Sequence, residues 1–585
     1  MKSVNLLFAM IFLLVSWTIA QSFDPQYVHS QSGDTLVVKD DVEFGGSNTL
    51  YLLMRSDSLA PAGRVYVLQD GGIYSFDNNP VTSSKYKTII MGQSEKSVKT
   101  RQGAPPPIIC GDFRAEIFTG GGINIAKDLL IKNVDLELGN SFGNFGGWAY
   151  FTFNGPGLRL QVDNCIMEHT WWTWVGSPPA NSRIFFTNDY FVNLNGFTCR
   201  RNGGVLDFFS NQDTIFVENC THVNTQGSLY RFRYGHTVNR VIFNHNDFID
   251  CAGYVFMNNG DQTMMSITNN IFVNCQLQAY CPVLFSVDAG EVDPDGLPMG
   301  LVNVRVDSVF NARGKNFYAD KNLAYWDTSL SDIVPILNAN HVNDNTLWVS
   351  QMILMNTRTE TLFDDNKNYP LLTNGTWITD KLPSFASTDV LFTTQLAKLK
   401  TYAIACVDTS YGTPLDSWRQ PRNQETSHFI YADWPIPIDL SYTDPDLLTS
   451  GLGGFPLGDL NWFPTQYASW KAQASEEYTY IYEMLHITGA VGTKTNIPQK
   501  FQLQQNYPNP FNPTTVIRFT IPKAGYVSLI VYNMLGQEVA TLVDGYKAAQ
   551  KYNVNFDASD LPSGVYIYSV KFDNQILTRK MILIK

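Results

Sequence analysis

Four arginines surround one aspartate in the middle of the chain. Arg200 and Arg201 precede Asp207, and Arg231 and Arg233 follow it. A guanidinium binds carboxylates through a planar fork of donors and stays charged at physiological pH. If these residues cluster on one face of the fold, across two coils, they could form a catalytic site. The alternative is a set of solvated arginine pairs.

An acidic segment offers the chemistry of a metal site. Asp288, Glu291, Asp293 and Asp295 lie close together, and Gly296 follows the last of them. Calcium takes several oxygen ligands, which carboxylates supply. The segment therefore predicts a calcium site, the one cofactor that the sequence indicates, with an ordinary acidic turn as the alternative. Zinc has no support, because the chain lacks paired Cys-x-x-Cys motifs and a His-Glu-x-x-His motif.

Three tryptophans stand close together in the stretch HTWWTWVG. These residues are Trp171, Trp172 and Trp174. Tryptophan is rarely buried completely, so three within four positions are not all expected in a core. Exposed indoles present apolar faces to sugar rings, and the stretch therefore predicts a glycan-binding ledge. Packing of a loop against the fold is the alternative.

Other catalytic patterns in the sequence are weak. The segment GNSFG (139–143) matches Gly-x-Ser-x-Gly, but a nucleophile elbow needs a helix after it, and NFGGWAYFTF is not helical. A glycosidase needs two carboxylates at a set separation, and the sequence does not single out a pair. No residue is therefore assigned as catalytic.

Repeated segments predict the elements that position these residues. VIFNHNDFIDC (241–251) and MSITNNIFVNC (265–275) are near-copies, and related segments lie on both sides of them. The strands are rich in Val, Ile, Phe and Thr, alternate with period two, and recur at intervals typical of stacked coils. Using Asn270 as the anchor, the expected ladder is Asn133, Asn164, Asp189, Asn219, Asn246, Asn270 and Asp307. The sequence predicts a right-handed parallel β-helix, with an antiparallel sandwich as the alternative.

Asparagine at the anchor has a physical reason. It tolerates a left-handed turn between strands better than most residues. Its amide can also donate to one neighbouring coil and accept from the other. We therefore expect the anchors to align in a single column along the stack.

The domain organisation follows the chain in order. Residues 1–21 have the charged start and apolar core of a signal peptide, and no later segment is long and apolar enough to span a membrane. Residues 22–110 are interpreted as the N-terminal cap and first coils, 111–345 as regular coils, and 346–495 as a flank or cap. That last region contains the unusual stretch GGFPLGDLNWFP (453–464).

The net charge and the cysteine spacing limit the classes of partner and the disulfides that the chain can have. The net charge of −12 argues against binding to nucleic acid. The eight cysteines do not have the spacing of a small disulfide scaffold. Cys251 and Cys275 fall on adjacent predicted coils, so at most one disulfide is expected, between these two.

The end of the chain carries the most specific pattern. The segments FQLQQNYPNPFNPTTVIRFTIP, VSLIVYNMLGQEVATLV and LPSGVYIYSVKFDNQILTRKMILIK contain alternating strands separated by turn residues, as in a sandwich. Residues 499–585 closely resemble the C-terminal sorting domain of type IX secretion cargo, an Ig-like sandwich similar to the Ig-like domain of flagellar hook-capping proteins. The resemblance implies that the type IX machinery is a partner and that the protein is secreted or attached to the outer-membrane surface.

The coils resemble the pectate-lyase-like β-helix superfamily, whose lyases use an arginine or lysine base and acidic residues that hold calcium against a uronate. The fold class is therefore all-β: a parallel β-helix followed by a small Ig-like sandwich. The favoured function is a non-catalytic secreted or surface-displayed protein that binds glycans or acts as an envelope or adhesion component. The alternatives are a polysaccharide lyase or glycoside hydrolase acting on an acidic polysaccharide, and a self-assembling structural element.

Overall fold

The structure of the chain is a computed structural model. It describes residues 23–76, 85–111, 122–137, 148–170, 172–194, 203–233, 235–258, 261–277, 297, 299–304, 315–338, 353–388, 390–405, 407, 434–485, 500–522, 525–547, 551–572 and 575–585. The predicted signal peptide, Trp171, Arg200 and Arg201 lie outside these residues. So do the four predicted calcium ligands Asp288, Glu291, Asp293 and Asp295, and the predicted anchor Asp307.

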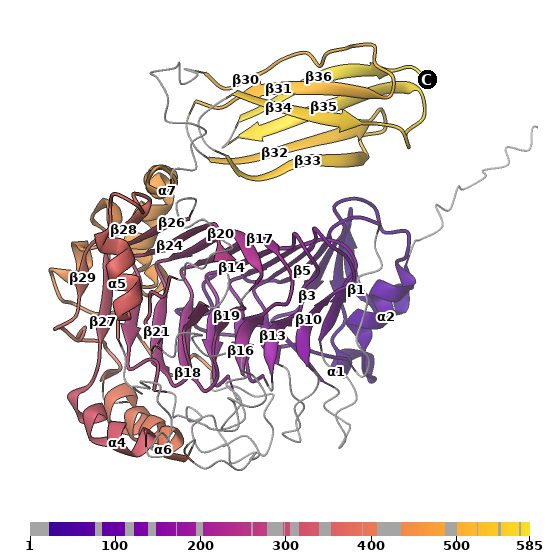
Figure 1. The fold of residues 1–585 in the computed structure, drawn as a ribbon. Helices are drawn as coiled ribbons and strands as arrows, with labels where there is room; N and C mark the ends of the chain where they lie inside the picture. Colours follow the sequence, from indigo (N-terminus) through magenta and orange to yellow (C-terminus); the bar gives the residue numbers. More distant parts are fainter. Residues whose placement is uncertain are drawn as a thin grey trace, which may run out of the picture.

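The body of the protein is a parallel β-solenoid with three sheets (Figure 1). Sheet A contains β1 (Val28–Ser32), β2 (Thr35–Val38), β3 (Val65–Leu68), β5 (Thr88–Gly92), β8 (Leu129–Lys132), β11 (Arg159–Asp163), β14 (Arg183–Thr187), β17 (Gln212–Glu218), β20 (Thr237–Asn244), β23 (Asp261–Gln262), β24 (Met264–Thr268), β26 (Asn316–Asp320) and β28 (Leu372–Asn374). Sheet B contains β4 (Ile73–Phe76), β6 (Ile108–Gly111), β9 (Asp135–Glu137), β12 (Ile166–Glu168), β15 (Tyr190–Val192), β18 (Thr221–Thr225), β21 (Asp247–Cys251), β25 (Ile271–Val273), β27 (Asn322–Tyr325) and β29 (Trp377–Ile378). Sheet C contains β7 (Ile123–Ile125), β10 (Ala149–Phe153), β13 (Thr173–Gly176), β16 (Gly204–Asp207), β19 (Tyr230–Phe232) and β22 (Phe256–Asn258).

Each complete coil passes from sheet A to sheet B to sheet C, as β11, β12 and β13 do. Only β1 pairs antiparallel to its neighbour within these three sheets; every other pairing described in them is parallel. Parallel crossovers are right-handed in nearly all proteins. The prediction of an all-β solenoid is therefore confirmed, and the antiparallel alternative for the body is wrong.

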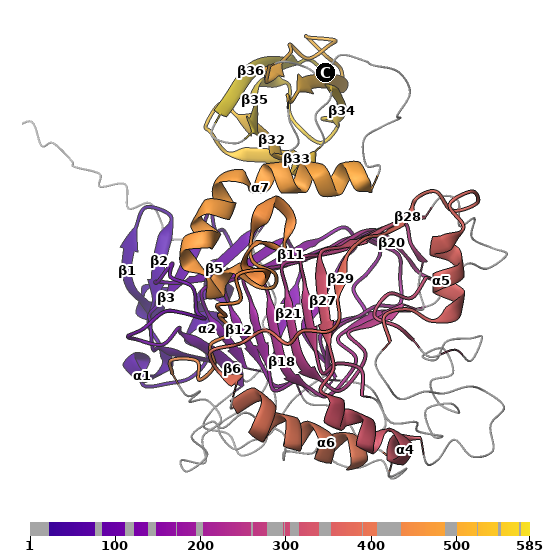
Figure 2. The same cartoon turned by 90° about the vertical axis from the view of Figure 1, so that its left-hand side faces the viewer.

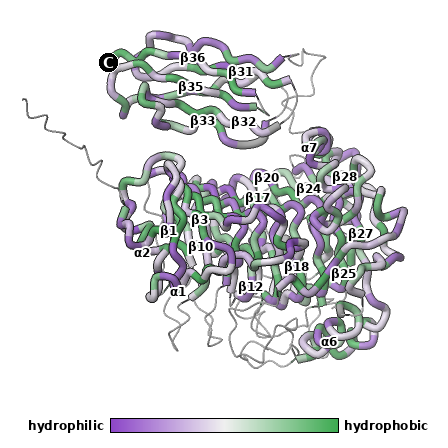
Figure 3. Tube along the Cα trace, turned by 180° about the vertical axis from the view of Figure 1, so that it is seen from behind, coloured by the Kyte–Doolittle hydropathy of each residue, from purple (hydrophilic) through white to green (hydrophobic). Residues whose placement is uncertain are grey.

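The core lies inside the coils and is built from residues that repeat in register. Phe191, His222, Phe248 and Phe272 stand on successive strands of sheet B, and their rings stack with centroids 4.5, 4.4 and 5.0 Å apart. Hydropathy alternates along the strands, as expected for one face inside and one outside (Figure 3). Complete burial lowers the pKa of His222 to about 3, so the ring stays neutral within the stack.

The corner between sheets A and B corrects the prediction of a single asparagine column. The first corner residue has a left-handed φ of 52–61° in seven consecutive coils: Asn133, Asn164, Asn188, Asn219, His245, Asn269 and Lys321. Register places Asp189, Asn246 and Asn270 one residue further along, in a second column. Both columns favour asparagine, which makes them hard to distinguish in the sequence.

The second column carries the amide ladder. Nδ2 of Asn246 donates to Oδ1 of Asn270 (2.9 Å), and Nδ2 of Asn270 donates to Oδ1 of Asn322 (3.0 Å). Asn322 thus occupies the ladder position after Asn270. In the first column, Asn164 donates to Oδ1 of Asn133 at 2.9 Å. Expected amide bonding between coils is present, but it runs along two parallel columns.

The disulfide expected between Cys251 and Cys275 is absent, and both residues are free thiols. Each sulfur lies 3.9 Å or less from a carbonyl oxygen of the preceding coil, at His222 and Phe248 respectively. Adjacent parallel strands are about 4.8 Å apart, closer than the Cα separation of most disulfides. In-register stacking therefore favours two parallel thiols over a bridge.

Short helices cover the two ends of the body. At one end lie α1 (Asp41–Phe44) and α2 (Thr49–Ser56), fixed by the buried carboxylate of Asp41, which accepts hydrogen bonds from Thr49 and Ser75. At the other end lie α4 (Val334–Leu337), α5 (Thr357–Asp364) and α6 (Leu396–Ala405), with α4 and α6 on the side opposite the last domain (Figures 1 and 2). These caps cover terminal coils that would otherwise expose strand edges.

The chain after the coils folds back over their outer surface (Figure 2). Residues 434–463 cross sheet B, where Leu440, Tyr442 and Leu457 pack on outward residues such as Ile249 and Ile271. We call this segment the strap. Helix α7 (Pro464–Met484) then lies on sheet A, where Trp470, Tyr478 and Tyr482 pack against Phe216 and Ile242.

The C-terminal module is an antiparallel sandwich. One sheet contains β30 (Gln502–Leu503), β31 (Thr514–Thr520) and β34 (Lys551–Asp557), and the other contains β32 (Gly525–Asn533), β33 (Glu538–Lys547), β35 (Gly564–Phe572) and β36 (Gln575–Leu583). Its own core includes Phe519, Leu529 and Tyr568. It lies over sheet A, with β32 and β33 nearest the body (Figures 1 and 2). Among the described residues, no helix has the length and hydropathy of a membrane span.

Candidate binding surface

The outer face of sheet C brings the predicted arginine–aspartate cluster together. Gly176, Asp207 and Arg231 occupy one outward column on β13, β16 and β19. Their neighbours Leu206 and Tyr230 belong to the core inside the coils. Alternation along each strand therefore places the charged residues outside and the apolar residues inside.

Asp207 is held by two arginines from the next coil. Arg233 makes a bidentate pair with it, with Nε to Oδ1 at 2.6 Å and Nη2 to Oδ2 at 2.8 Å, and Nη1 of Arg231 lies 3.4 Å from Oδ2. The side chains of Asp207 and Arg231 are 3% and 5% exposed, whereas that of Arg233 is 16% exposed. Two guanidiniums thus hold one buried carboxylate rigidly, and Arg233 is the more accessible of them to an anionic or hydroxyl-rich ligand.

Aromatic rings flank this cluster. Trp148 precedes β10 and is 41% exposed, and its ring centroid lies 5.2 Å from that of Trp172. The indole of Trp148 passes over Gly176, where any Cβ would overlap Nε1. Beyond Asp207, the guanidinium of Arg233 lies 4.2 Å from the ring centroid of Phe209, which is 47% exposed. The surface thus presents apolar ring faces beside fixed charges.

The three predicted tryptophans have different positions. Trp172 belongs to this surface, and Trp171 lies outside the described residues. Trp174 does not belong to a ledge, because its side chain is fully buried and its ring lies 4.9 Å from that of Tyr150. Trp172 and Trp174 are two positions apart, where strand alternation predicts the same face, but Trp172 precedes β13 whereas Trp174 lies within it and packs in the core.

Sequence reasoning missed Trp148 and Phe209. Ala149 is in register with Thr173, which places Trp148 and Trp172 at equivalent positions of adjacent coils. An alignment of GGWAYF with TWWTWV would have found this pair. Phe209 follows the charged residue of its strand by two positions, and no comparable signal marks it.

A second polar cluster lies between sheet A and α7. Nδ2 of Asn244 donates to Oε1 of Glu218 (3.0 Å) and to Oε1 of Glu477 (2.7 Å), and the hydroxyl of Tyr478 donates to Glu218. Burial, with a further contribution from the charge of Glu477, raises the pKa of Glu218 to about 7. A cavity of about 380 Å³ adjoins Glu477. Since Trp470 and Asn269 also donate to Glu477, these carboxylates attach α7 to the coils.

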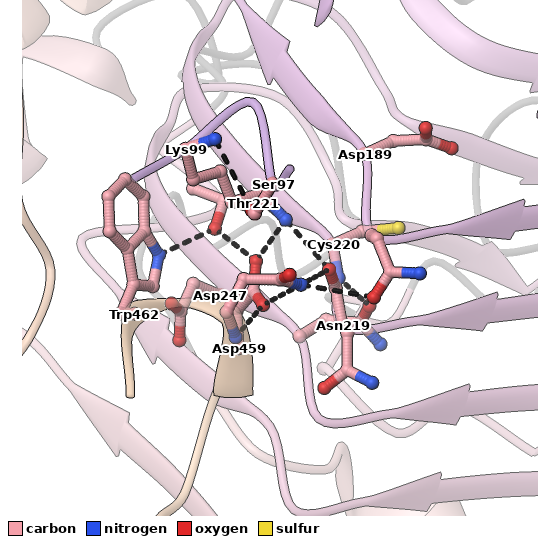
Figure 4. Close-up of polar contacts among 12 residues, drawn as sticks. Ser97, Lys99, Asp189, Asn219, Cys220, Thr221, Asp247, Asp459 and Trp462 are labelled. Atoms are coloured by element: carbon pink, nitrogen blue, oxygen red, sulfur yellow. Dashed lines mark hydrogen bonds and ion pairs between the residues drawn. The ribbon is translucent and has the colours of Figure 1, made fainter. Parts of the chain in front are cut away.

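A third cluster fixes the strap to sheet B (Figure 4). Lys99 and Asp459 form a completely buried ion pair, and Nζ of Lys99 also donates to the carbonyl oxygen of Asn219 at 2.8 Å. The hydroxyl of Thr221 donates to Asp459 (2.8 Å) and accepts from the indole of Trp462 (3.0 Å). Gly458 has a φ of +76° and lies against Asp247, so no side chain fits there. The stretch GDLNW (458–462) therefore fixes the strap to sheet B.

The remaining predicted site is a metal site. Within the described residues, no group of three or more His, Cys, Asp or Glu side chains has the arrangement of a metal site. The predicted calcium ligands lie outside those residues. The calcium site therefore stays a prediction.

Comparison with known proteins identifies one module. Residues 505–585 match the family model described as a secretion system C-terminal sorting domain, which confirms the prediction for the last sandwich. No curated protein and no solved structure matches the chain. The parallel coils fit the predicted β-helix, and the likeness to pectate-lyase-like proteins stays a prediction.

Proposed function

We propose that this protein is displayed on or released from the cell surface and binds a polysaccharide through the outer face of sheet C. The sorting domain at 505–585 supports export through the type IX secretion system, to a cell-surface or secreted location. Residues 1–21 would serve as the signal peptide for the first membrane. The domain boundaries 22–110, 111–345 and 346–495 then describe the exported body and its flank.

The observation that carries the proposal is the combination of Trp148 and Trp172 with the Asp207 cluster. Indole faces stack on the apolar faces of sugar rings, and fixed guanidinium donors bind hydroxyl or carboxylate groups of the same polymer. The strands beneath are rigid, so the rings are held in place before binding, which limits the entropy lost on association. A solenoid presents a long face along its axis, which suits an extended polymer.

Binding without catalysis is the form of the proposal that the site favours. Both Arg231 and Arg233 share the carboxylate of Asp207. An arginine held in such a pair keeps its protons and is a poor base. These contacts are therefore sufficient for polysaccharide binding, whereas lyase or hydrolase chemistry requires a further residue.

The test is retention of the full-length protein on a panel of neutral and acidic polysaccharides. We expect Trp148→Ala to weaken binding to the preferred polymer by about tenfold, since loss of a stacked, exposed ring removes a contact without opening the core. Leu59→Ala, at a residue that is 81% exposed on the N-terminal cap, is the matched control and should bind like the parent.

Two results would contradict the proposal. One is unchanged retention of both Trp148→Ala and Arg233→Ala on every polymer that the parent binds. The other is the appearance of shortened or unsaturated oligosaccharides during the incubation, which would favour the lyase or hydrolase alternative. Export has its own test, since removal of residues 505–585 should keep the protein inside the cell.

A further inference from the structure

The sorting domain rests on a column of cations on the outer face of sheet A. Register aligns Arg159 with Arg183, and Arg183 with Thr214 and Arg240. Thr88 is in register with Leu129, and Leu129 with Leu160. Lys87 and Asp128, which precede Thr88 and Leu129, therefore extend the same column. Over six coils the column therefore reads Lys87, Asp128, Arg159, Arg183, Thr214 and Arg240. Four cations and one carboxylate face outward along one line, at about 4.8 Å per coil, and Nη2 of Arg183 lies 3.7 Å from Oδ2 of Asp128.

Arg159 is the point where the sorting domain contacts this column. Nη1 lies 2.7 Å from Oδ2 of Asp544 and donates to the hydroxyl of Tyr526. The guanidinium also lies over the ring of Phe185, 4.3 Å from its centroid, and over the ring of Tyr526. Arg159 itself is only 4% exposed. A carboxylate and a ring thus occupy a built site on the body.

The docked domain neutralises only part of the column. Loss of hydration and repulsion from Arg159 lower the pKa of Lys87, while Asp544, Asp128 and Glu538 act in the opposite direction. At the other end, burial and the charge of Arg240 lower the pKa of Lys547, a cation of the sorting domain, while Asp213 acts in the opposite direction. The Nε atoms of Arg159 and Arg240 are buried without a hydrogen-bond partner. The charge of the sorting domain therefore complements that of the column at Asp544 and opposes it at Lys547.

We propose that this column is a second binding site, for a linear polysaccharide that carries carboxylates, and that the sorting domain blocks it by placing Asp544 on Arg159. Carboxylates of such a polymer would pair with the cations of the column on both sides of Asp128, including Arg240 at the end where Lys547 now faces like charge. Undocking of the sorting domain would open the site. The proposal is independent of the surface on sheet C, which lies on another face of the coils.

The experiment uses the full-length chain and polygalacturonate oligomers as the probe, with titration at low and at high salt. We expect Asp544→Asn to bind the probe about tenfold more tightly than the parent, because the internal carboxylate is removed while its shape remains. The gain should disappear in the double variant Asp544→Asn/Arg159→Gln and should diminish at high salt. Asp557→Asn, at an exposed aspartate of the same domain, is the control and should bind like the parent.

A second set of measurements distinguishes binding to the column from binding at sheet C. In a Trp148→Ala chain, the gain from Asp544→Asn should persist if the column is a distinct site. Equal affinity of Asp544→Asn and the parent would overturn the proposal, and so would a gain that survives Arg159→Gln. A neutral polymer of the same length should show no gain, and a gain there would also count against carboxylate recognition.

Discussion

Asn219 and Asn246 show how one residue type meets two different requirements at a corner. Asn219 takes a left-handed φ of 52°, which asparagine tolerates. Asn246 lies one position further in its coil and accepts the backbone N–H of Cys220 at 3.0 Å. The main role of Asn219 is conformational, with one long hydrogen bond from the backbone N–H of Leu460 (3.3 Å), whereas Asn246 makes the hydrogen bond between coils. Substitution by glycine should therefore be tolerated at Asn219 far better than at Asn246.

Glu218 gives the clearest pH dependence at the residue scale. Its pKa is about 7 in the folded protein and near 4.5 when exposed. Between these values the folded state holds a proton that the unfolded state has lost, so the contribution of Glu218 to stability falls as pH rises. Relative to the parent, Glu218→Gln should gain up to about 3 kcal/mol between about pH 4 and about pH 8.

Denaturant unfolding of both proteins at each pH measures this difference. His222 titrates with the opposite sign, because its folded pKa is lowered, but it is present in both proteins and cancels. Glu95→Gln is the matched control, since the side chain of Glu95 is 63% exposed. Parallel stability profiles for the parent and Glu218→Gln would mean that the carboxyl group stays ionised in the fold.

At the scale of elements, sequence patterns predicted which segments form strands better than they predicted which residue occupies each corner position. The near-copies around Phe248 and Phe272 predict stacked parallel strands, and these two rings do stack in the core. The phase of the ladder was wrong by one residue because asparagine suits both corner columns. Trp174 was misplaced because it lies within β13 and packs in the core, whereas Trp172 precedes the strand, a difference that their proximity in the sequence does not reveal.

The strap is an element that the sequence did not place. GGFPLGDLNWFP stood out by composition, yet the partners of Asp459 are Lys99 and Thr221, which are far away in the chain. Local patterns carry no information about such pairings. The same holds for Glu477, whose contacts with sheet A depend on where α7 lies.

The Lys99–Asp459 pair predicts the energetics of the strap. Asp459→Ala leaves a buried ammonium without its carboxylate and should lower the free energy of unfolding by about 3–5 kcal/mol. Lys99→Met/Asp459→Leu removes both charges and should recover most of this loss, since an apolar pair of similar size avoids desolvation. Unfolding of Lys99→Met, of Asp459→Leu and of the double variant gives the coupling energy. Additive losses would show that the two charges are not coupled.

At the scale of the whole molecule, the body and the sorting domain have separate cores. Leu529 lies in the core of the sandwich and Leu206 in the core of the coils, and both are fully buried. The polar contact at Arg159 connects the two cores, together with a limited approach of β32 to α7. Inter-domain contacts of this polar kind transmit little stability. The two parts should therefore unfold in separate transitions.

Leu529→Ala should lower the stability of the sorting domain by about 2–5 kcal/mol, the usual cost of a cavity in a core, and leave the transition of the coils unchanged. Leu206→Ala is the matched variant in the body and should move only the other transition. Calorimetry of the full-length chain resolves both. If each substitution moved both transitions together, the contact through Arg159 and Asp544 would be strong enough to unite the two folds. The sorting domain could then not undock without unfolding the coils, and a blocked site beneath it would have no route to opening.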